Sequence, residues 1–388
     1  MATHTYTRRA ILADLFRITA CTAIGTPAMK AIAQSEFGAP RQQRRGLGQY
    51  TQGFQQEYRV PAMSVAISKV GRFVYDRAGG MADRKDMMQA QQSTLFRIAD
   101  LSKPITAVTI FSLIQAGKVN LNDKVFGRSG ILGTKYGKTP FKSYVMDITV
   151  DHLLTHTAGG WAADESDPMY RNNGWDQAKL IASTIENAPL TSQPGTQWAY
   201  SNFGYCVLGR VIEQVTGQPY DAYVQTNILA PCGITTMQIA RNSERQRAAD
   251  EVVYIGQYSE DPYKINVNRM DSTAGWIASS TQLVQFLNHV AGAPGIPALL
   301  KPETVRAMTT PVAAYPGGNV RYARGWMVAD NGAGTWFHGG SLPGSTSLMV
   351  RNPDGSCSAA LCNTRTQPHG EMDDALYEMI WTLTQNAG

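Results

Sequence analysis

Apolar and polar residues alternate at both ends of the chain, as they do in half-buried β-strands. Residues 64–68 and 72–76 alternate in this way on either side of Gly71 and predict a hairpin. Four segments near the C-terminal end also predict strands: 324–329, 335–338, 345–350 and 357–362. Because predicted strands at both ends of the chain flank a long region that is mostly helix and loop, we expect one domain assembled from the two ends.

Helical periodicity fills the region between the strands. The longest pattern predicts a helix near 101–116, which Gly117 is positioned to end. Further helices are predicted at 176–187, 203–216, 220–229, 281–291 and 371–384. This order predicts a domain formed by residues 34–95 and 255–388, with a mainly helical domain, residues 96–254, inserted between its two parts.

Composition and charge exclude several classes of protein. The chain has 388 residues, of which 43% are hydrophobic and 17% charged, so it can bury a large core and is not expected to be disordered. It contains no run of about 18 apolar residues, so no membrane-spanning helix is expected. The net charge is only +5, without a basic block after the N-terminal region, so a nucleic-acid partner is not expected either.

The first 33 residues have the character of an export signal. They contain Arg8, Arg9, Arg17 and Lys30 against Asp14, which gives a local charge of 4 − 1 = +3. Residues 7–12 resemble a twin-arginine signal, and the Ala-Ile-Ala sequence at 31–33 resembles a cleavage site. We therefore expect residues 1–33 to direct the protein to the periplasm or out of the cell. The alternative is a cytoplasmic protein with a basic tail.

Cysteine and histidine spacing gives no sign of metal binding. The chain has five cysteines, and neither a Cys-x-x-Cys nor a His-Glu-x-x-His pattern occurs. Cys357 and Cys362 lie in one predicted strand at an odd spacing, so their side chains should face opposite sides and not form a disulfide. We expect no metal and no cofactor.

Four short motifs follow one another along the chain. They are Phe-Arg-Ile-Ala-Asp-Leu-Ser-Lys-Pro at 96–104, Leu-Leu-Thr-His-Thr-Ala-Gly-Gly at 153–160, Tyr-Ser-Asn at 200–202 and His-Gly-Gly-Ser at 338–341, at the end of a predicted strand. Together they resemble the penicillin-recognising serine hydrolases, a superfamily that includes class C β-lactamases, D-aminopeptidases and related esterases. The resemblance covers about residues 45–385. It implies an α+β fold of the serine β-lactamase type, with an antiparallel sheet flanked by helices and an inserted helical domain.

The resemblance also implies a chemistry. In this superfamily a serine at the start of a helix is the nucleophile, and a lysine three residues later, nearly one helical turn, manages its proton. Lys103 occupies the lysine position, Tyr200 would be the general acid and base, and Asn202 would orient these groups. The implied activity is hydrolysis or transfer of an acyl group from a small-molecule ester or amide, without a cofactor.

The last motif would bind the substrate. The resemblance implies that His338 and the backbone of Gly339, Gly340 and Ser341 hold the substrate oxygen, with the N–H of Ser341 in the oxyanion hole. Histidine in place of the usual lysine is more typical of esterases and amidases than of β-lactamases. Trp161 would lie at the rim of the site and contact substrate. Five aromatic residues could line an acyl pocket, although core packing is favoured for most of them: Trp161, Tyr170, Trp175, Trp198 and Tyr205. The sequence gives no indication of the oligomeric state.

The chain departs from the superfamily at the nucleophile, where Asp100 stands in place of serine. Ser102 is not a replacement, because two residues along a helix turn a side chain by about 200°. A carboxylate beside Lys103 should be ionised, and one of its oxygens could fill the oxyanion hole. Three hypotheses remain open. Asp100 replaces the serine of a parent enzyme, or it works as a general acid or base with Lys103 and Tyr200, or the chain is an inactive relative that binds a ligand in the retained cleft.

Overall fold

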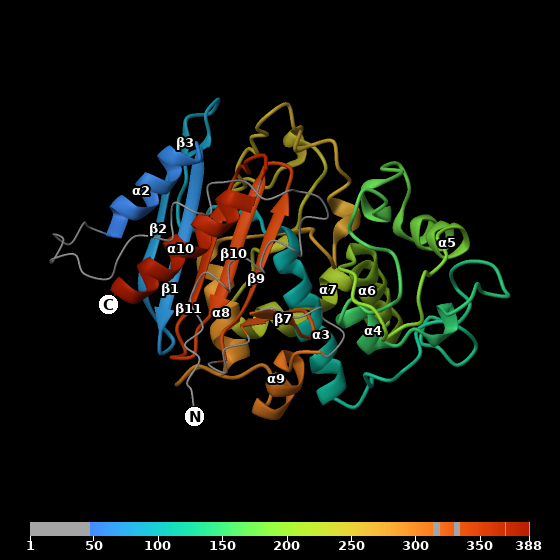
Figure 1. Cartoon of the computed structure of the whole chain (residues 1–388). Helices are drawn as coiled ribbons and strands as arrows, with labels where there is room; N and C mark the ends of the chain where they lie inside the picture. The colour runs from blue at the N-terminus through green and yellow to red at the C-terminus, as the bar shows by residue number, and fades with distance from the viewer. Residues whose placement is uncertain (1–46, 313–318, 330–333, 369, 388) are drawn as a thin grey trace.

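An eight-stranded antiparallel sheet forms the centre of the molecule (Figure 1). The computed structural model describes residues 47–312, 319–329, 334–368 and 370–387, so the predicted export signal lies outside it and stays a prediction. The strand order is β3-β2-β1-β11-β10-β9-β8-β7. The strands are β1 (Ala62–Lys69), β2 (Arg72–Asp83), β3 (Met88–Gln89), β7 (Val320–Tyr322), β8 (Met327–Ala329), β9 (Trp336–Leu342), β10 (Ser345–Arg351) and β11 (Cys357–Cys362).

The first strand pairs with the last. Met63 in β1 lies opposite Cys362 in β11, and Ser68 lies opposite Cys357. The predicted hairpin is confirmed as β1 and β2. The strand predicted at 335–338 is longer than expected, because β9 continues through the glycines and pairs with β10 as far as Leu342. Residues 338–341 therefore lie inside a strand and not at its end.

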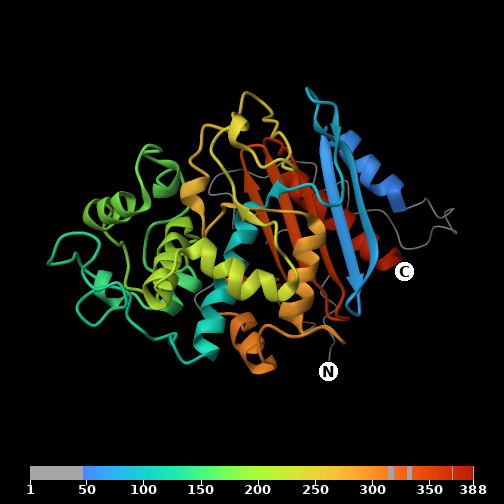
Figure 2. The same ribbon diagram turned by 180° about the vertical axis from the view of Figure 1, so that it is seen from behind.

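Helices cover both faces of the sheet. On one face lie α2 (Leu47–Glu57) and α10 (Gly370–Asn386), and on the other lies α8 (Ser280–Ala291), which is seen from behind in Figure 2. Residues that alternate along each strand divide between two apolar cores, so that Cys357 faces one core and Cys362 the other. Both cysteines are free, which confirms that they do not bridge.

The middle of the chain forms a mainly helical region beside the sheet (Figures 1 and 2). Its helices are α3 (Ser102–Gln115), α4 (Val150–Leu154), α5 (Gln177–Asn187), α6 (Asn202–Thr216) and α7 (Tyr220–Val224), and α7 continues as a π-helical turn, Gln225–Leu229. Several features were not predicted, among them α2, strands β3 and β7, α9 (Pro302–Thr309), and a small sheet of β4 (Phe96–Arg97), β6 (Trp276–Ala278) and β5 (Gln238–Ile239). The α+β architecture is confirmed, while the domain boundaries stay a prediction.

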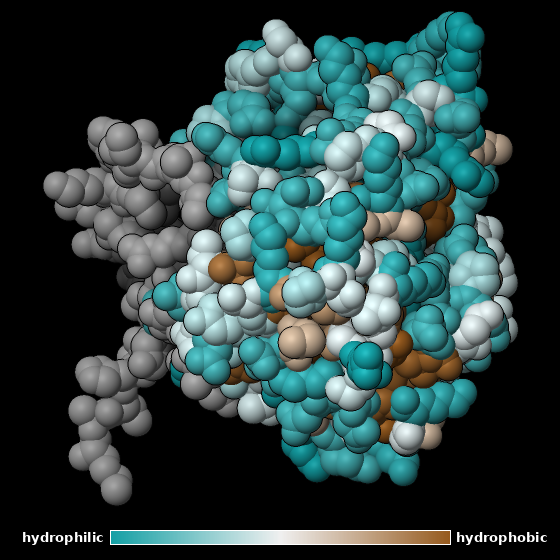
Figure 3. All heavy atoms as spheres, turned by 90° about the vertical axis from the view of Figure 1, so that its right-hand side faces the viewer, coloured by the Kyte–Doolittle hydropathy of each residue, from teal (hydrophilic) through white to brown (hydrophobic). Residues whose placement is uncertain are grey.

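The outer face of the helical region is mostly hydrophilic, with apolar side chains in small separate patches (Figure 3). Within the described residues, no helix combines the length and the apolar character needed to cross a membrane. The same part of the chain contains no group of three or more His, Cys, Asp or Glu side chains placed to hold a metal ion.

Candidate active site

Asp100 lies where the chain passes from the small sheet into α3. A 3₁₀ turn, Ala99–Leu101, directly precedes Ser102–Gln115, so Asp100 and Lys103 are neighbours on one helical surface. Ala99 has φ 49°, a left-handed conformation that is strained for a residue with a Cβ atom. Asp100 is 8% exposed and Lys103 is completely buried. Their Oδ1 and Nζ atoms are 2.5 Å apart, so they form a buried ion pair.

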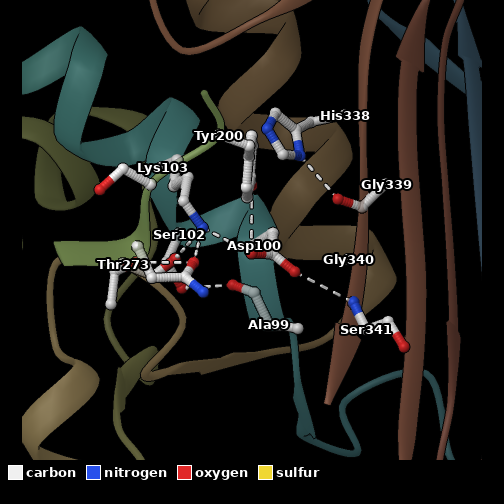
Figure 4. A network of polar contacts seen from close by, with 12 residues as sticks. Ala99, Asp100, Ser102, Lys103, Tyr200, Thr273, His338, Gly339, Gly340 and Ser341 are labelled. Carbon is white, nitrogen blue, oxygen red and sulfur yellow. Dashed lines mark hydrogen bonds and ion pairs between the residues drawn. The ribbon is translucent and has the colours of Figure 1, made fainter. Parts of the chain in front are cut away.

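Hydrogen-bond donors from three elements converge on the Asp100 carboxylate (Figure 4). Oδ1 accepts from Lys103 Nζ and also from the Tyr200 hydroxyl at 3.1 Å. Oδ2 accepts from the backbone N–H of Ser341 in β9 at 3.2 Å. Oδ1 thus stands between the two side chains expected to move protons, and Oδ2 stands at the donor expected to form the oxyanion hole.

These contacts fix the charge of Asp100. Burial raises the pKa of the Asp100 carboxyl group. The charge of Lys103 and the hydrogen bonds from Lys103 and Ser341 lower this pKa by more than burial raises it, so it lies below its usual value. Burial lowers the pKa of Lys103, and the charge of Asp100 opposes this shift. Burial and the Asp100 charge raise the pKa of Tyr200 well above its ordinary value, so the phenol keeps its proton. The site therefore holds an ionised carboxylate with a neutral phenol as donor.

Lys103 is connected to a second carboxylate through Asn202. Besides Asp100, Lys103 Nζ donates to Asn202 Oδ1 at 2.7 Å and to the Thr273 carbonyl at 3.3 Å. Asn202 begins α6, and its Nδ2 donates to Asp167 Oδ2 at 2.7 Å. Burial raises the pKa of Asp167 to about 6. Asn202 therefore contacts Lys103 from the side, and its orienting role stays a prediction.

Aromatic side chains hold Tyr200 in place. Its ring centroid lies 4.2 Å from that of His156, and Lys103 Nζ lies 4.7 Å from the Tyr200 ring centroid. His156 is buried, and its Nδ1 accepts from the Ser201 N–H at 3.0 Å. Burial lowers the pKa of His156 well below its usual value, so the imidazole is neutral. His156 thus supports the backbone and ring of the Tyr-Ser-Asn motif.

His338 lies beside Tyr322 and is completely buried. Its Nε2 is 3.3 Å from the Tyr322 hydroxyl, and its Nδ1 is 2.6 Å from the carbonyl oxygen of Gly339. Burial lowers the pKa of His338 to about 4, so the side chain is an uncharged imidazole at neutral pH. Its role in holding a substrate oxygen stays a prediction.

The two glycines of β9 differ in what surrounds them. A Cβ atom on Gly340 would lie 2.7 Å from the Ile98 carbonyl oxygen and 2.9 Å from the Asp100 nitrogen, which is too close. On Gly339 its nearest neighbour would be the Ser347 carbonyl oxygen at 4.0 Å. Gly340 thus allows β9 to approach the turn that carries Asp100, and this approach brings Ser341 N–H to the carboxylate.

Ser102 and Trp161 lie apart from the carboxylate. Ser102 is completely buried; its Oγ donates to the Ala99 carbonyl at 2.8 Å and accepts from the Trp276 N–H at 3.3 Å. The Trp161 Nε1 donates to the Ala188 carbonyl at 2.8 Å. Trp161 lines a cavity of about 240 Å³ whose lining residues do not include Asp100, Lys103 or Tyr200. Its contact with substrate stays a prediction.

The sequence patterns missed several residues near the carboxylate. Asp167 is one of them. Glu260 and Arg365 are two others: they form an ion pair beside β9, and Arg365 Nη1 also donates to Ser341 Oγ at 3.2 Å. Tyr170, one of the five aromatic residues of which most were expected to pack in the core, is 41% exposed. Among these residues, only Asp167 carried a sequence signal, because the Asp-Pro pair at 167–168 is typical of a turn.

The arrangement suits acyl chemistry. A lysine and a phenol that meet at one oxygen can exchange protons with it, and a backbone N–H aimed at a second oxygen can stabilise a developing oxyanion. The model of the family described as Beta-lactamase matches residues 47–379.

The chain is also similar to individual proteins. Protein flp of Staphylococcus aureus (strain MRSA252) is 26% identical over 300 residues, which are 77% of this chain and 58% of that protein. Esterase EstB of Burkholderia gladioli is 30% identical over 193 residues, 46% of this chain and 47% of that protein. The crystal structure of D-amino acid amidase from Ochrobactrum anthropi SV3 superposes with a TM-score of 0.67 at 22% identity, covering 87% of this chain and 99% of the amidase. The family match, which extends over most of the chain, shows that the chain belongs to the Beta-lactamase family.

Proposed function

We propose that this site is built to hydrolyse or transfer the acyl group of a small-molecule ester or amide, and that Asp100 prevents the acyl-serine step in the chain as it stands. The observation that carries the proposal is the convergence of Lys103 Nζ, Tyr200 OH and Ser341 N–H on one side chain. Family membership supports it, as does the similarity to an esterase over part of the chain and to the fold of an amidase.

With serine at position 100, each group has a task. Lys103 would take the hydroxyl proton: burial already lowers its pKa, and removing the Asp100 charge removes the largest opposing effect. The serine oxygen would then attack the carbonyl carbon, whose oxygen would receive the Ser341 N–H that Oδ2 now occupies. Tyr200, which is protonated at neutral pH, would give its proton to the leaving group, and the proton taken up by Lys103 would restore the phenol.

Asp100 stops this sequence in two ways. Its oxygens accept hydrogen bonds from the groups that would serve the nucleophile and the substrate carbonyl. Attack by a carboxylate would also form an anhydride instead of an acyl-serine. Loss of a serine nucleophile costs on the order of 10⁶-fold in turnover. Ordinary acyl-serine catalysis should therefore be absent.

A ligand-binding protein without catalysis is the second candidate. It is favoured over a working carboxylate base by the lowered pKa of Asp100 and by the donors that already satisfy it, because such a carboxylate is a weak base. In this candidate the cleft keeps its shape and binds a small ester, amide or related molecule without cleaving it.

The test compares hydrolysis of a chromogenic short-chain ester by the chain as it stands, by Asp100→Ser and by Asp100→Asn, with Asp100→Ser/Lys103→Met as the matched control. We expect hydrolysis in Asp100→Ser alone, lost again in the double variant. Hydrolysis by the unaltered chain that disappears in Asp100→Asn would instead establish a working carboxylate. Inactivity of every variant, with ligand binding retained, would replace the proposal by the binding candidate.

A further inference from the structure

Asp167 is a buried carboxylate that the steps above do not use. It is 2% exposed and lies at the start of a 3₁₀ turn, Pro168–Tyr170, in a loop of the helical region. Both of its oxygens accept hydrogen bonds: Oδ1 from the Met169 N–H at 2.9 Å and Oδ2 from Asn202 Nδ2 at 2.7 Å. The side chain therefore closes its own turn and at the same time reaches α6.

The contacts of Asn202 fix the direction of its amide group. Lys103 Nζ can only donate, so it must face Asn202 Oδ1, and a carboxylate without a proton can only accept, so it must face Nδ2. Thr273 Oγ1 also lies 3.3 Å from Asn202 Oδ1. Asp167 is thus the acceptor that keeps the amide oxygen directed at Lys103.

The loop that carries Asp167 is itself held firmly. Arg269 is 4% exposed, and its guanidinium donates to backbone carbonyls of this loop, those of Met169, Arg171, Asn172 and Trp175. A side chain held by such a scaffold is preorganised and not free to follow its partner.

We propose that Asp167 is a positioning residue that fixes the Asn202 amide and, through it, places the ammonium group of Lys103 beside residue 100. The charged or titratable groups around Asp167 are Lys103 and Asp100 on α3 and the turn before it, Arg269 behind the loop, and Tyr170 within it. When residue 100 is a neutral serine, Asp167 becomes the carboxylate that balances Lys103 through Asn202.

Asp167→Asn is the informative substitution. The two donors approach different oxygens of Asp167, and in asparagine one of these oxygens is replaced by an NH2 group, which is itself a donor. In the present geometry the variant can therefore accept from the Met169 N–H or from Asn202 Nδ2 and sets a donor against the other. Asp164→Asn is the matched control, because Asp164 lies three positions earlier in the same loop, is exposed, and its side chain accepts hydrogen bonds from Ser166. Its backbone carbonyl accepts from the Asp167 N–H, a contact that the substitution leaves in place.

One measurement requires the proposed function. In the Asp100→Ser background, we expect Asp167→Asn to lower kcat about 10- to 100-fold with little change in KM, as for loss of a hydrogen bond to a charged group. The acid limb of the kcat/KM profile should also move to lower pH, because the Asp167 charge raises the pKa of Lys103. Asp164→Asn should change neither. A variant that loses thermal stability but keeps its kcat and pH profile would show a merely structural role and overturn the proposal.

A second measurement uses the chain with Asp100 and needs no activity. In protein labelled with ¹⁵N-asparagine, the side-chain amide signal of Asn202, assigned with an Asn202→Ser variant, should titrate with a midpoint near pH 6. The titration should persist in Asp164→Asn and vanish in Asp167→Asn. An Asn202 signal that is the same in Asp167→Asn would overturn the proposal. If Asp100→Ser shows no hydrolysis, this titration still decides the role of Asp167.

Discussion

The Asp100–Lys103 pair places two charges where water has little access. Such pairs persist only when hydrogen bonds replace the lost hydration. Here the carboxylate also accepts from Tyr200 and Ser341, and the ammonium group also donates to Asn202 and Thr273. Each charge therefore has two neutral hydrogen-bonding partners in addition to the opposite charge. Removal of either charged side chain leaves the other one buried without its counter-charge, which lowers the free energy of unfolding.

Lys103→Met should show how strongly the stability of the fold depends on the Asp100–Lys103 ion pair. It leaves the Asp100 carboxylate buried without its cation, and we expect the free energy of unfolding to fall by about 3–5 kcal/mol in urea titrations. Asp100→Ser/Lys103→Met is the control and should regain most of the loss, because both charges are gone. Equal stability of the single and double variants would contradict the account.

Asp167 predicts a pH dependence of stability. Its pKa is raised from 3.8 to about 6 in the folded protein, so folding favours its protonated form. Its favourable contribution is complete below pH 3.8 and is lost as the pH rises through about 6. We expect Asp167→Asn to be relatively more stable, compared with the unaltered chain, at pH 8 than at pH 4. Urea titrations at both pH values measure this, and a difference of the opposite sign would refute it.

At the residue scale, the sequence predicted the groups that carry local signatures. Lys103, Tyr200 and Ser341 all donate to Asp100, while the roles that their motifs implied stay predictions. The role of Asp167 could not be predicted, because its partner lies 35 residues away and contact between the two depends on how a loop folds. The neutral state of His338 was equally hidden, since it follows from burial and not from spacing.

Among the elements, β9 and the turn before α3 can lie in close contact because Gly340 has no side chain. Their separation leaves no room for a side chain between Gly340 and the backbone of Ile98 and Asp100. The sequence predicted a strand over 335–338, although paired glycines weaken strands in general. The pairing of Gly340 with Ser347 and of Ser341 with Thr346 continues the strand nevertheless, because tertiary contacts outweigh local propensity.

Gly340→Ala should push these two elements apart. We expect it to lower the free energy of unfolding by about 1–3 kcal/mol, the usual cost of overpacking, and to lengthen the contact between Ser341 N–H and Asp100. Gly339→Ala is the matched control and should change stability little, because a methyl group there has room. Denaturant titrations of both variants measure the difference, and similar stabilities would show that the strand can shift at no cost.

For the whole molecule, Asn363 joins three distant parts of the chain. Its Oδ1 accepts from the Ala62 N–H at 2.7 Å, its Nδ2 donates to the Val253 carbonyl at 2.8 Å, and its backbone N–H donates to the Ala62 carbonyl at 3.2 Å. The side chain is completely buried. It thus fixes the start of β1, the middle of the chain and the end of β11 relative to one another.

Asn363→Ala should destabilise the entire fold. It leaves the Ala62 N–H and the Val253 carbonyl without these partners, and each unsatisfied buried group costs about 1–3 kcal/mol. Asn386→Ala is the control, because Asn386 is exposed on α10 and bonds only within its own helix. Thermal unfolding should show a marked loss for the first variant and almost none for the second. A loss of the same size in both would contradict this role.

At this scale the sequence predicted a domain built from both ends of the chain, because alternation is a strong signal and the helical patterns lie between the strands. The sequence did not predict the strand order or the small sheet of β4, β5 and β6. Strands as short as these carry no readable period, and Phe96 in β4 pairs with Ala278 in β6, far along the chain.

The pairing of β1 with β11 has a consequence during synthesis on the ribosome. About 290 residues separate the two strands, which at roughly 5–20 residues per second is a delay of about 15–60 s. During that interval β1 lacks one of its two neighbours, although nearly all of its side chains are buried in the finished protein. The nascent chain therefore presents an apolar strand edge to the cell until its last segments emerge, and binding of a chaperone to this edge would favour correct folding over aggregation.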